Sequence, residues 1–198
     1  MPTVTANSLT AMSPKFARFV MFKLFGWRYA SDSDSVIPEK KAIFLAAPHT
    51  SIWDFVIGYM YARSVGVKFK VMIKKEAFFF PFGLILRALG GFPIDRSHPQ
   101  KVLMGVMHEM EKSDTFYLCM CPEGTRKAVR KWKTGYHSIA SHTGVPVYAG
   151  YYDYKKKIFA HGPSFELTDD ARADTDRIQQ FYRSLDLTAL HPECYTTE

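Results

Sequence analysis

Two side chains separated by four residues, His49 and Asp54, form the first pair that could carry chemistry. A neutral imidazole accepts a proton from a hydroxyl near neutral pH, and it does so better when its second nitrogen donates to a carboxylate. Residues five apart in a continuous helix lie roughly 140° apart around its axis, so the pair can meet only if His49 lies in a turn before the helix. The sequence predicts that turn at 48–51. Taken alone, the pair also fits a turn-capping histidine and an exposed aspartate.

A second polar block, Pro122–Arg126, directly follows an apolar run. Gly124 offers free backbone N–H groups, Thr125 a hydroxyl and Arg126 a guanidinium fork, and this combination suits a phosphate. Four further basic residues follow closely, at 127, 130, 131 and 133. The alternative interpretation is a solvated basic loop.

Other cations stand at the ends of predicted strands. Arg96 closes the segment Gly90–Arg96 and could be a second phosphate clamp, or it could form a surface ion pair. Lys74 and Lys75 follow another strand and could face an anion or simply solvate the strand end.

The elements that must position these residues alternate between strand and helix. The patterns predict strands at 42–47, 68–73, 92–95, 115–121 and 145–152, with 155–160 as a possible partner of the last. They predict helices at 52–64, 82–89, 99–112, 134–143 and 168–187. Alternation of this kind predicts an α/β fold, a single domain with a largely parallel sheet flanked by helices. In such sheets sites form at the carboxyl ends of strands, where the polar blocks lie.

The segment Pro14–Tyr29 has apolar residues at spacings of three and four, with basic residues between them. This pattern predicts an N-terminal amphipathic helix, which would either anchor at a membrane interface or pack on the core. We therefore divide the chain into a flexible N-terminus (1–12), the amphipathic helix and a linker (13–41) and the α/β domain (42–198).

Composition narrows the class of partner. The chain has 198 residues and a net charge of +7, which suits one domain and an anionic partner. Three cysteines are too few for a disulfide framework, and we expect buried thiols and no metal site. We expect no secretory signal, and the apolar stretch 77–94 is too interrupted by Pro81, Arg87 and the Gly90-Gly91 pair to span a bilayer.

In this order, the blocks resemble the glycerolipid acyltransferase family, which includes the lysophosphatidic acid acyltransferases. Its His-four-residues-Asp block looks like His49–Asp54, and its Gly-x-x-Ile-Asp-Arg block looks like Gly91–Arg96. Its Phe-Pro-Glu-Gly-Thr-Arg block looks like Cys121–Arg126, and its Val-Pro block looks like Val145–Val147. The resemblance covers about 42–151, over half of the chain.

The resemblance implies roles for these residues. His49 would be the general base and Asp54 its orienting partner, and the acceptor hydroxyl would attack the thioester directly. The residues implied at the acceptor and its phosphate are Glu123, Gly124, Thr125, Arg126, Arg96 and Lys75. The family implies no cofactor, with acyl-CoA or acyl-carrier protein as co-substrate.

Three departures from the family pattern bear on the acceptor. Cys121 replaces the usual Phe, Tyr148-Ala149 replaces the final Pro of the fourth block, and Pro48 replaces the usual Asn before His49. The resemblance makes lysophosphatidate the expected acceptor. Because the first block is short and contains Trp53, a different lipid acceptor is the alternative.

The expected function is transfer of a fatty acyl group to a lysophosphatidate-like glycerolipid, by a cytoplasmic protein peripheral on the inner face of the membrane. The alternatives are an acyltransferase with a different lipid acceptor and a catalytically silent, basic membrane-binding module. Nucleic-acid binding through 127–133 is disfavoured, because no known nucleic-acid motif is present and aromatic residues do not alternate with the basic ones along this cluster.

Overall fold

A seven-stranded sheet of order β1-β7-β6-β2-β5-β3-β4 organises the chain. The computed structural model describes residues 12–30 and 39–195, so most of the predicted flexible N-terminus and linker lies outside the described residues. The strands are β1 (Arg28–Tyr29), β2 (Lys41–Ala47), β3 (Phe69–Lys74), β4 (Gly91–Ile94), β5 (Phe116–Met120), β6 (Val147–Asp153) and β7 (Ile158–Phe165). The helices are α1 (Pro14–Arg18), η1 (Phe19–Leu24), α2 (Trp53–Ser64), η2 (Lys75–Ala77), α3 (Phe82–Ala88), α4 (Pro99–Lys112), α5 (Gly135–Thr143), α6 (Ala171–Ser184) and η3 (Pro192–Cys194).

All strand pairs are parallel except β6 with β7, which are antiparallel, so the predicted largely parallel α/β sheet is confirmed. The central strand β2 lies between β5 and β6, and its apolar residues are buried on both faces. A wholly apolar run is what a strand covered by helices on both sides requires.

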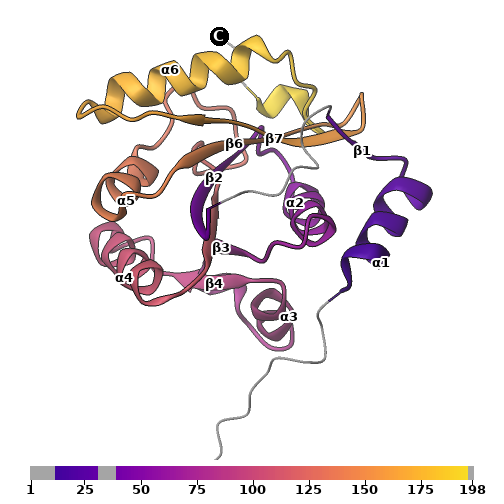
Figure 1. Ribbon diagram of the computed structural model, residues 1–198, viewed down its shortest axis with the longest axis horizontal. Helices are drawn as coiled ribbons and strands as arrows, with labels where there is room; N and C mark the ends of the chain where they lie inside the picture. The colour runs from indigo at the N-terminus through magenta and orange to yellow at the C-terminus, as the bar shows by residue number, and fades with distance from the viewer. Residues whose placement is uncertain (1–11, 31–38, 196–198) are drawn as a thin grey trace, which may run out of the picture.

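Helices cover both faces of the sheet. Figure 1 shows α4 and α5 on one side of the strands and α1, α2 and α3 on the other. The larger apolar core lies under α4, α5 and α6 and includes Met110, Ile139 and Ile178, each fully buried. A second core joins α1, η1 and α2 to β6 and β7 around Met21 and Phe159. The sheet is therefore held rigidly from both sides.

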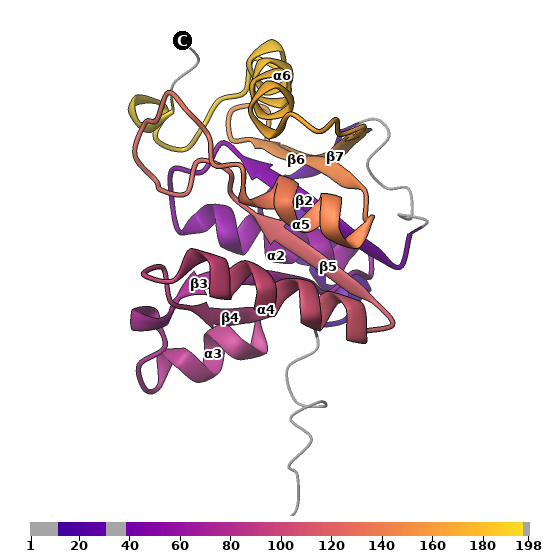
Figure 2. The same ribbon diagram turned by 90° about the vertical axis from the view of Figure 1, so that its left-hand side faces the viewer.

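The carboxyl ends of β2, β3, β4 and β5 lie at the same edge of the sheet, because each of these strands pairs in parallel with its neighbour. In Figure 2 the loops that follow these strands gather at that edge. These loops contain the polar blocks that the sequence singles out. The fold thus brings the blocks to one place, as expected for parallel α/β sheets.

The N-terminal segment differs from the single predicted helix. It forms α1, then the wider π-type turn η1, and ends before Gly26, whose φ of +69° no longer fits a helix. Ala17 and Met21 are buried against the core, whereas Phe16 and Phe19 are more than half exposed. One face of this segment therefore packs on the domain core, and the other face is apolar and exposed. Anchoring of the segment at a membrane interface stays a prediction.

The most apolar stretch of the chain forms three short elements rather than one long helix. Residues 77–94 contain the end of η2, the seven-residue helix α3 and the edge strand β4. Phe80, just before α3, is 83% exposed. Among residues 12–30 and 39–195, no helix has the length and apolar character that crossing a membrane requires.

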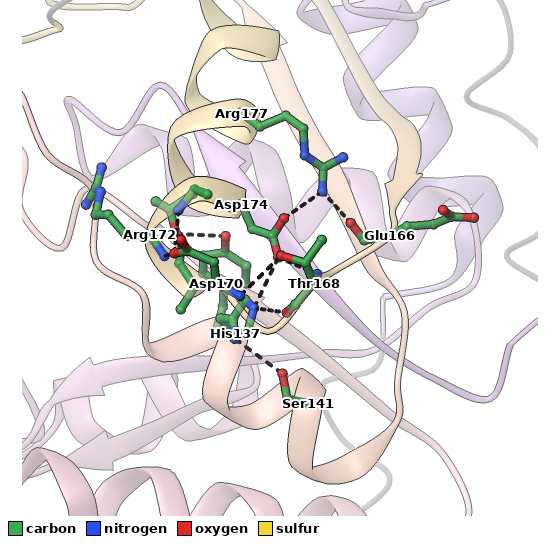
Figure 3. A network of polar contacts seen from close by, with 12 residues as sticks. His137, Ser141, Glu166, Thr168, Asp170, Arg172, Asp174 and Arg177 are labelled. Atoms are coloured by element: carbon green, nitrogen blue, oxygen red, sulfur yellow. Dashed lines mark hydrogen bonds and ion pairs between the residues drawn. The ribbon is translucent and has the colours of Figure 1, made fainter.

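A polar network fastens α5 to α6 (Figure 3). His137 Nε2 lies 3.2 Å from Asp174 Oδ2 and 3.0 Å from the Thr168 carbonyl oxygen, and its Nδ1 lies 3.2 Å from Ser141 Oγ. Arg177 bonds to the second carboxylate oxygen of Asp174 at 2.9 Å. Because His137 and Asp174 are buried with partners for their polar atoms, hydrogen bonds offset the cost of removing them from water, and the network orders the two helices.

Candidate active site

The turn after β2 brings His49 and Asp54 together. His49 Nδ1 lies 3.2 Å from Asp54 Oδ2, and α2 begins only at Trp53, so the chain folds back as the turn prediction requires. The side chain of His49 is 22% exposed and that of Asp54 only 2%. Since Nδ1 faces a carboxylate, the neutral ring carries its proton on Nδ1 and a lone pair on Nε2. In the described part of the chain, no group bonds to Nε2.

Asp54 is fixed by three further donors. Its Oδ2 accepts hydrogen bonds from the backbone N–H groups of Thr50 (2.6 Å) and Ser51 (2.7 Å). Its Oδ1 accepts a hydrogen bond from the Tyr154 hydroxyl at 2.8 Å. Four donors therefore hold the carboxylate in one orientation, which in turn orients the His49 ring.

Tyr154 is a site residue that the sequence analysis missed. It lies in the turn between β6 and β7, one hundred residues from its partner Asp54, and outside all four sequence blocks. Burial, and then the nearby Asp54 charge, raise the pKa of Tyr154 well above its usual value, so it remains a donor. An exposed turn with a tyrosine gives no local signal of such a contact.

Glu123 lies beneath the His49 turn rather than at the surface. Only 5% of the residue is exposed, and its Oε2 accepts a hydrogen bond from the His49 backbone N–H at 2.8 Å. Burial raises the pKa of Glu123 to about 8, against an ordinary value of 4.5. The side chain thus links the third block to the first. The role at the acceptor phosphate that the resemblance implies for Glu123 stays a prediction.

The last three residues of the third block, Gly124, Thr125 and Arg126, are exposed or partly exposed. Gly124 has a φ of +70°, a backbone conformation that favours glycine, and Arg126 is exposed. The Thr125 hydroxyl accepts a hydrogen bond from the Lys127 N–H at 3.3 Å. Within residues 12–30 and 39–195, Arg126 forms no ion pair, so its guanidinium is available to an anion.

Arg96 and Lys75 approach the site from β4 and β3. Arg96 Nη1 lies 3.4 Å from the Gly124 carbonyl oxygen, which brings the second block against the third. Lys75 Nζ donates to Asp95 Oδ2 at 2.6 Å, and this bond holds the pKa of Asp95 well below its usual range. Arg96 therefore borders the candidate anion site, whereas Lys75 already has an acid beside it.

Taken together, the site offers a lone pair on His49 Nε2 and a rigid carboxylate behind it, with exposed guanidinium groups on the next two blocks. This arrangement can remove a proton from a hydroxyl while an anionic group of the same molecule is held nearby.

An α/β fold with this His–Asp turn and these blocks defines an acyltransferase class of domain. Comparison with known families agrees: residues 30–153, more than half of the 198, match the Acyltransferase family, to which the chain therefore belongs.

The 1-acyl-sn-glycerol-3-phosphate acyltransferase of Streptococcus pneumoniae is 32% identical over 109 residues. The match covers 54% of this chain and 40% of that protein, so the chain corresponds to less than half of its relative. The crystal structure of the 1-acyl-sn-glycerophosphate (LPA) acyltransferase PlsC from Thermotoga maritima has a TM-score of 0.58. That likeness covers 83% of this chain and 74% of the other at 19% identity, and it establishes the fold.

Proposed function

We propose that the chain transfers a fatty acyl group from a thioester to the free hydroxyl of a lysophosphatidate-like glycerolipid, with His49 as general base. The supporting observation is the contact between His49 Nδ1 and Asp54 Oδ2 at 3.2 Å, with Nε2 open at the sheet edge. Membership of the Acyltransferase family and the names of the two relatives point to the same reaction class.

The proposed reaction needs only side chains of this site. His49 Nε2 takes the proton from the acceptor hydroxyl as its oxygen attacks the thioester carbonyl carbon. Asp54 stabilises the imidazolium that forms. The tetrahedral adduct then breaks its C–S bond, and the leaving thiolate takes the proton from the imidazolium. The products are the acylated lipid and a free thiol, and His49 is neutral again.

The proposed acceptor carries a phosphate because two exposed arginines belong to the blocks that adjoin the His49 turn. Arg126 is exposed and Arg96 lies against Gly124, so a phosphate between the second and third blocks would gain charge-assisted hydrogen bonds. We expect Lys75 to contribute less, since it is bonded to Asp95. Glu123 would act on the acceptor through the backbone of His49.

The proposal includes a peripheral position on the inner face of the membrane, with acyl-CoA or acyl-carrier protein as donor. Long acyl chains gain about 0.8 kcal/mol for each CH₂ removed from water, so a catalyst that works beside the bilayer avoids extracting them. A net charge of +7 favours an anionic leaflet.

The test is a thiol-release assay with acyl-CoA and lysophosphatidate, with mass detection of the acylated product. We expect turnover in the wild type and its loss in His49→Ala, while His142→Ala, an exposed histidine of α5, should keep wild-type turnover. If His49→Ala retains turnover, the proposed mechanism is wrong.

The same assay separates the enzyme from a silent membrane-binding module. A silent module would release no thiol with either donor, even with the acceptor in excess. Repeating the assay with a neutral monoacylglycerol tests whether the protein recognises the phosphate of the acceptor. Arg126→Ala should lower turnover of lysophosphatidate about tenfold and leave turnover of the neutral acceptor unchanged.

A further inference from the structure

Three separate segments place exposed apolar side chains at the edge of the sheet where His49 lies. The first is the start of α2, where Ile52 and Trp53 are each 57% exposed, immediately after the His49 turn. Large apolar residues that stay exposed next to a functional turn commonly mark a contact surface.

The second segment follows β3. Lys74 ends the strand at this edge, and Phe79 and Phe80 come a few residues later with exposures of 60% and 83%. The apolar surface continues along α3 through Phe82, Leu84 and Ile85, all more than half exposed. The two cores on either side of the sheet contain none of these five side chains.

The third segment is the end of η1, where Leu24 is 65% and Phe25 56% exposed. Lys157 Nζ donates to the Phe25 carbonyl oxygen at 3.1 Å, so this tip lies against the β6–β7 turn. Tyr154 of the same turn bonds to Asp54, which brings the tip to the catalytic edge.

Exposed lysines lie among these apolar tips. Lys74 ends β3 and Lys75 follows it, and Lys155, Lys156 and Lys157 lie in the β6–β7 turn next to Phe25. Aromatic and aliphatic tips mixed with cations fit an anionic lipid surface, where rings enter the head-group region and ammonium groups meet phosphates. A protein partner would instead favour one continuous apolar patch with few lysines at its centre.

We infer that the rim formed by Leu24, Phe25, Ile52, Trp53, Phe79 and Phe80 inserts into the interface of an anionic bilayer, with the catalytic edge facing the lipid. This inference rests on the proposed lipid substrate, and it fixes the direction from which that substrate enters: out of the leaflet, directly onto His49.

The chain carries its own probe of this orientation. Trp53 lies in the rim, whereas the other two tryptophans, Trp27 and Trp132, are only 6% and 3% exposed. With vesicles of brominated phosphatidylcholine and phosphatidylglycerol, we expect quenching of wild-type fluorescence that disappears in Trp53→Phe. Vesicle binding without this quenching would overturn the inferred orientation.

A second measurement tests the apolar tips. The double variant Phe79→Ser/Phe80→Ser should partition into the same vesicles about a hundredfold less, at about tenfold per ring. The matched control is Met104→Ser, which removes a side chain 69% exposed on α4, on the opposite face of the sheet, and should bind as wild type does. Equal partitioning of the double variant and the control would refute the inference.

Neither measurement requires turnover, so the two proposals fail separately. A chain that shows Trp53 quenching but releases no thiol would overturn the proposed function and leave the docking rim intact. A chain that acylates a short-chain, fully soluble acceptor but shows no quenching would overturn the docking rim and leave the proposed function intact. Self-association in the ultracentrifuge that is abolished by Phe79→Ser/Phe80→Ser, without vesicle binding, would assign the rim to a second copy and overturn the inference.

Discussion

Within residues 12–30 and 39–195, two histidine–aspartate pairs have the same separation but different surroundings. His49 Nδ1 lies 3.2 Å from Asp54, and His137 Nε2 lies 3.2 Å from Asp174. The second nitrogen of His137 meets Ser141 Oγ, and its side chain is 7% exposed between α5 and α6 (Figure 3). His49 is 22% exposed at the sheet edge, with its second nitrogen open.

Contact with an aspartate does not by itself make a histidine a general base. A buried pair whose two nitrogens are both engaged has no lone pair to offer a substrate, so it contributes order to the helices. A pair at the carboxyl edge of parallel strands keeps one nitrogen for chemistry. The difference between the two pairs lies in the second nitrogen of each histidine, which is open in His49 and bonded in His137.

The largest expected effect is on turnover in Asp54→Asn. Replacing the carboxylate removes the charge that stabilises the imidazolium and favours the wrong ring tautomer, so we expect kcat to fall by about 10²–10⁴. Steady-state kinetics of thiol release measure this loss. A fall in kcat of less than tenfold would mean that His49 does not depend on its carboxylate, and the comparison would fail.

Glu123, which lies beside the first pair, should make the stability of the fold depend on pH. Its pKa is about 8 in the folded chain against an ordinary 4.5, so between these values the native state binds a proton that the unfolded chain has lost. The free energy of unfolding should therefore fall as pH rises through this window, by up to about 1.4 kcal/mol per pH unit. Urea unfolding of wild type and Glu123→Gln at several pH values checks this, and the two curves should converge toward acid pH. Parallel curves would show that Glu123 is ionised like an exposed acid.

The second pair should affect stability rather than turnover. His137→Ala leaves the buried Asp174 carboxylate short of one partner, and we expect a loss of about 1–3 kcal/mol in the free energy of unfolding. The folded fraction should retain wild-type kcat. A large loss of kcat in fully folded His137→Ala would show that the two pairs do not divide their roles in this way.

Tyr154→Phe should give the smallest effect. It removes one of four donors to Asp54, and a hydrogen bond to a charged group contributes about 1.5–3 kcal/mol at most, part of which the remaining donors recover. We expect kcat to fall about tenfold with little change in KM, because Asp54 is held less firmly behind His49. An unchanged kcat would limit Tyr154 to packing against Trp27, whose ring centroid lies 5.3 Å away.

Local signals predicted most of the elements. Helix α4 begins and ends at the predicted residues, because Pro99 suits a first helical turn and the apolar period runs unbroken to Lys112. Helix α6 is shorter than predicted: Asp170 caps its start by accepting from the N–H groups of Arg172 and Ala173, and it ends at Ser184. The β6–β7 hairpin was predicted, although β7 begins later than expected and runs on to Phe165.

The site was predictable only where its residues are near in sequence. The His49–Asp54 contact follows from a turn between a strand and a helix, and the sequence predicts both. The bonds of Tyr154 to Asp54 and of Glu123 to His49 join residues that are far apart in the chain, and only the sheet order sets those distances. The same holds for the exposed rim, since apolar residues in the sequence cannot show which of them the fold leaves uncovered.

The Asp54 carboxylate bonds to the backbone of the turn that precedes it, at Thr50 and Ser51, as well as to His49. The segment from His49 to Asp54 thus closes on itself through these contacts. The number of residues between the two side chains therefore sets where the imidazole lies. The side chains at 52 and 53 take no part in these contacts, so they can change without breaking them, whereas the insertion or loss of one residue would separate His49 from Asp54. The number of residues between His49 and Asp54 is accordingly more tightly constrained than the identity of the side chains at 52 and 53.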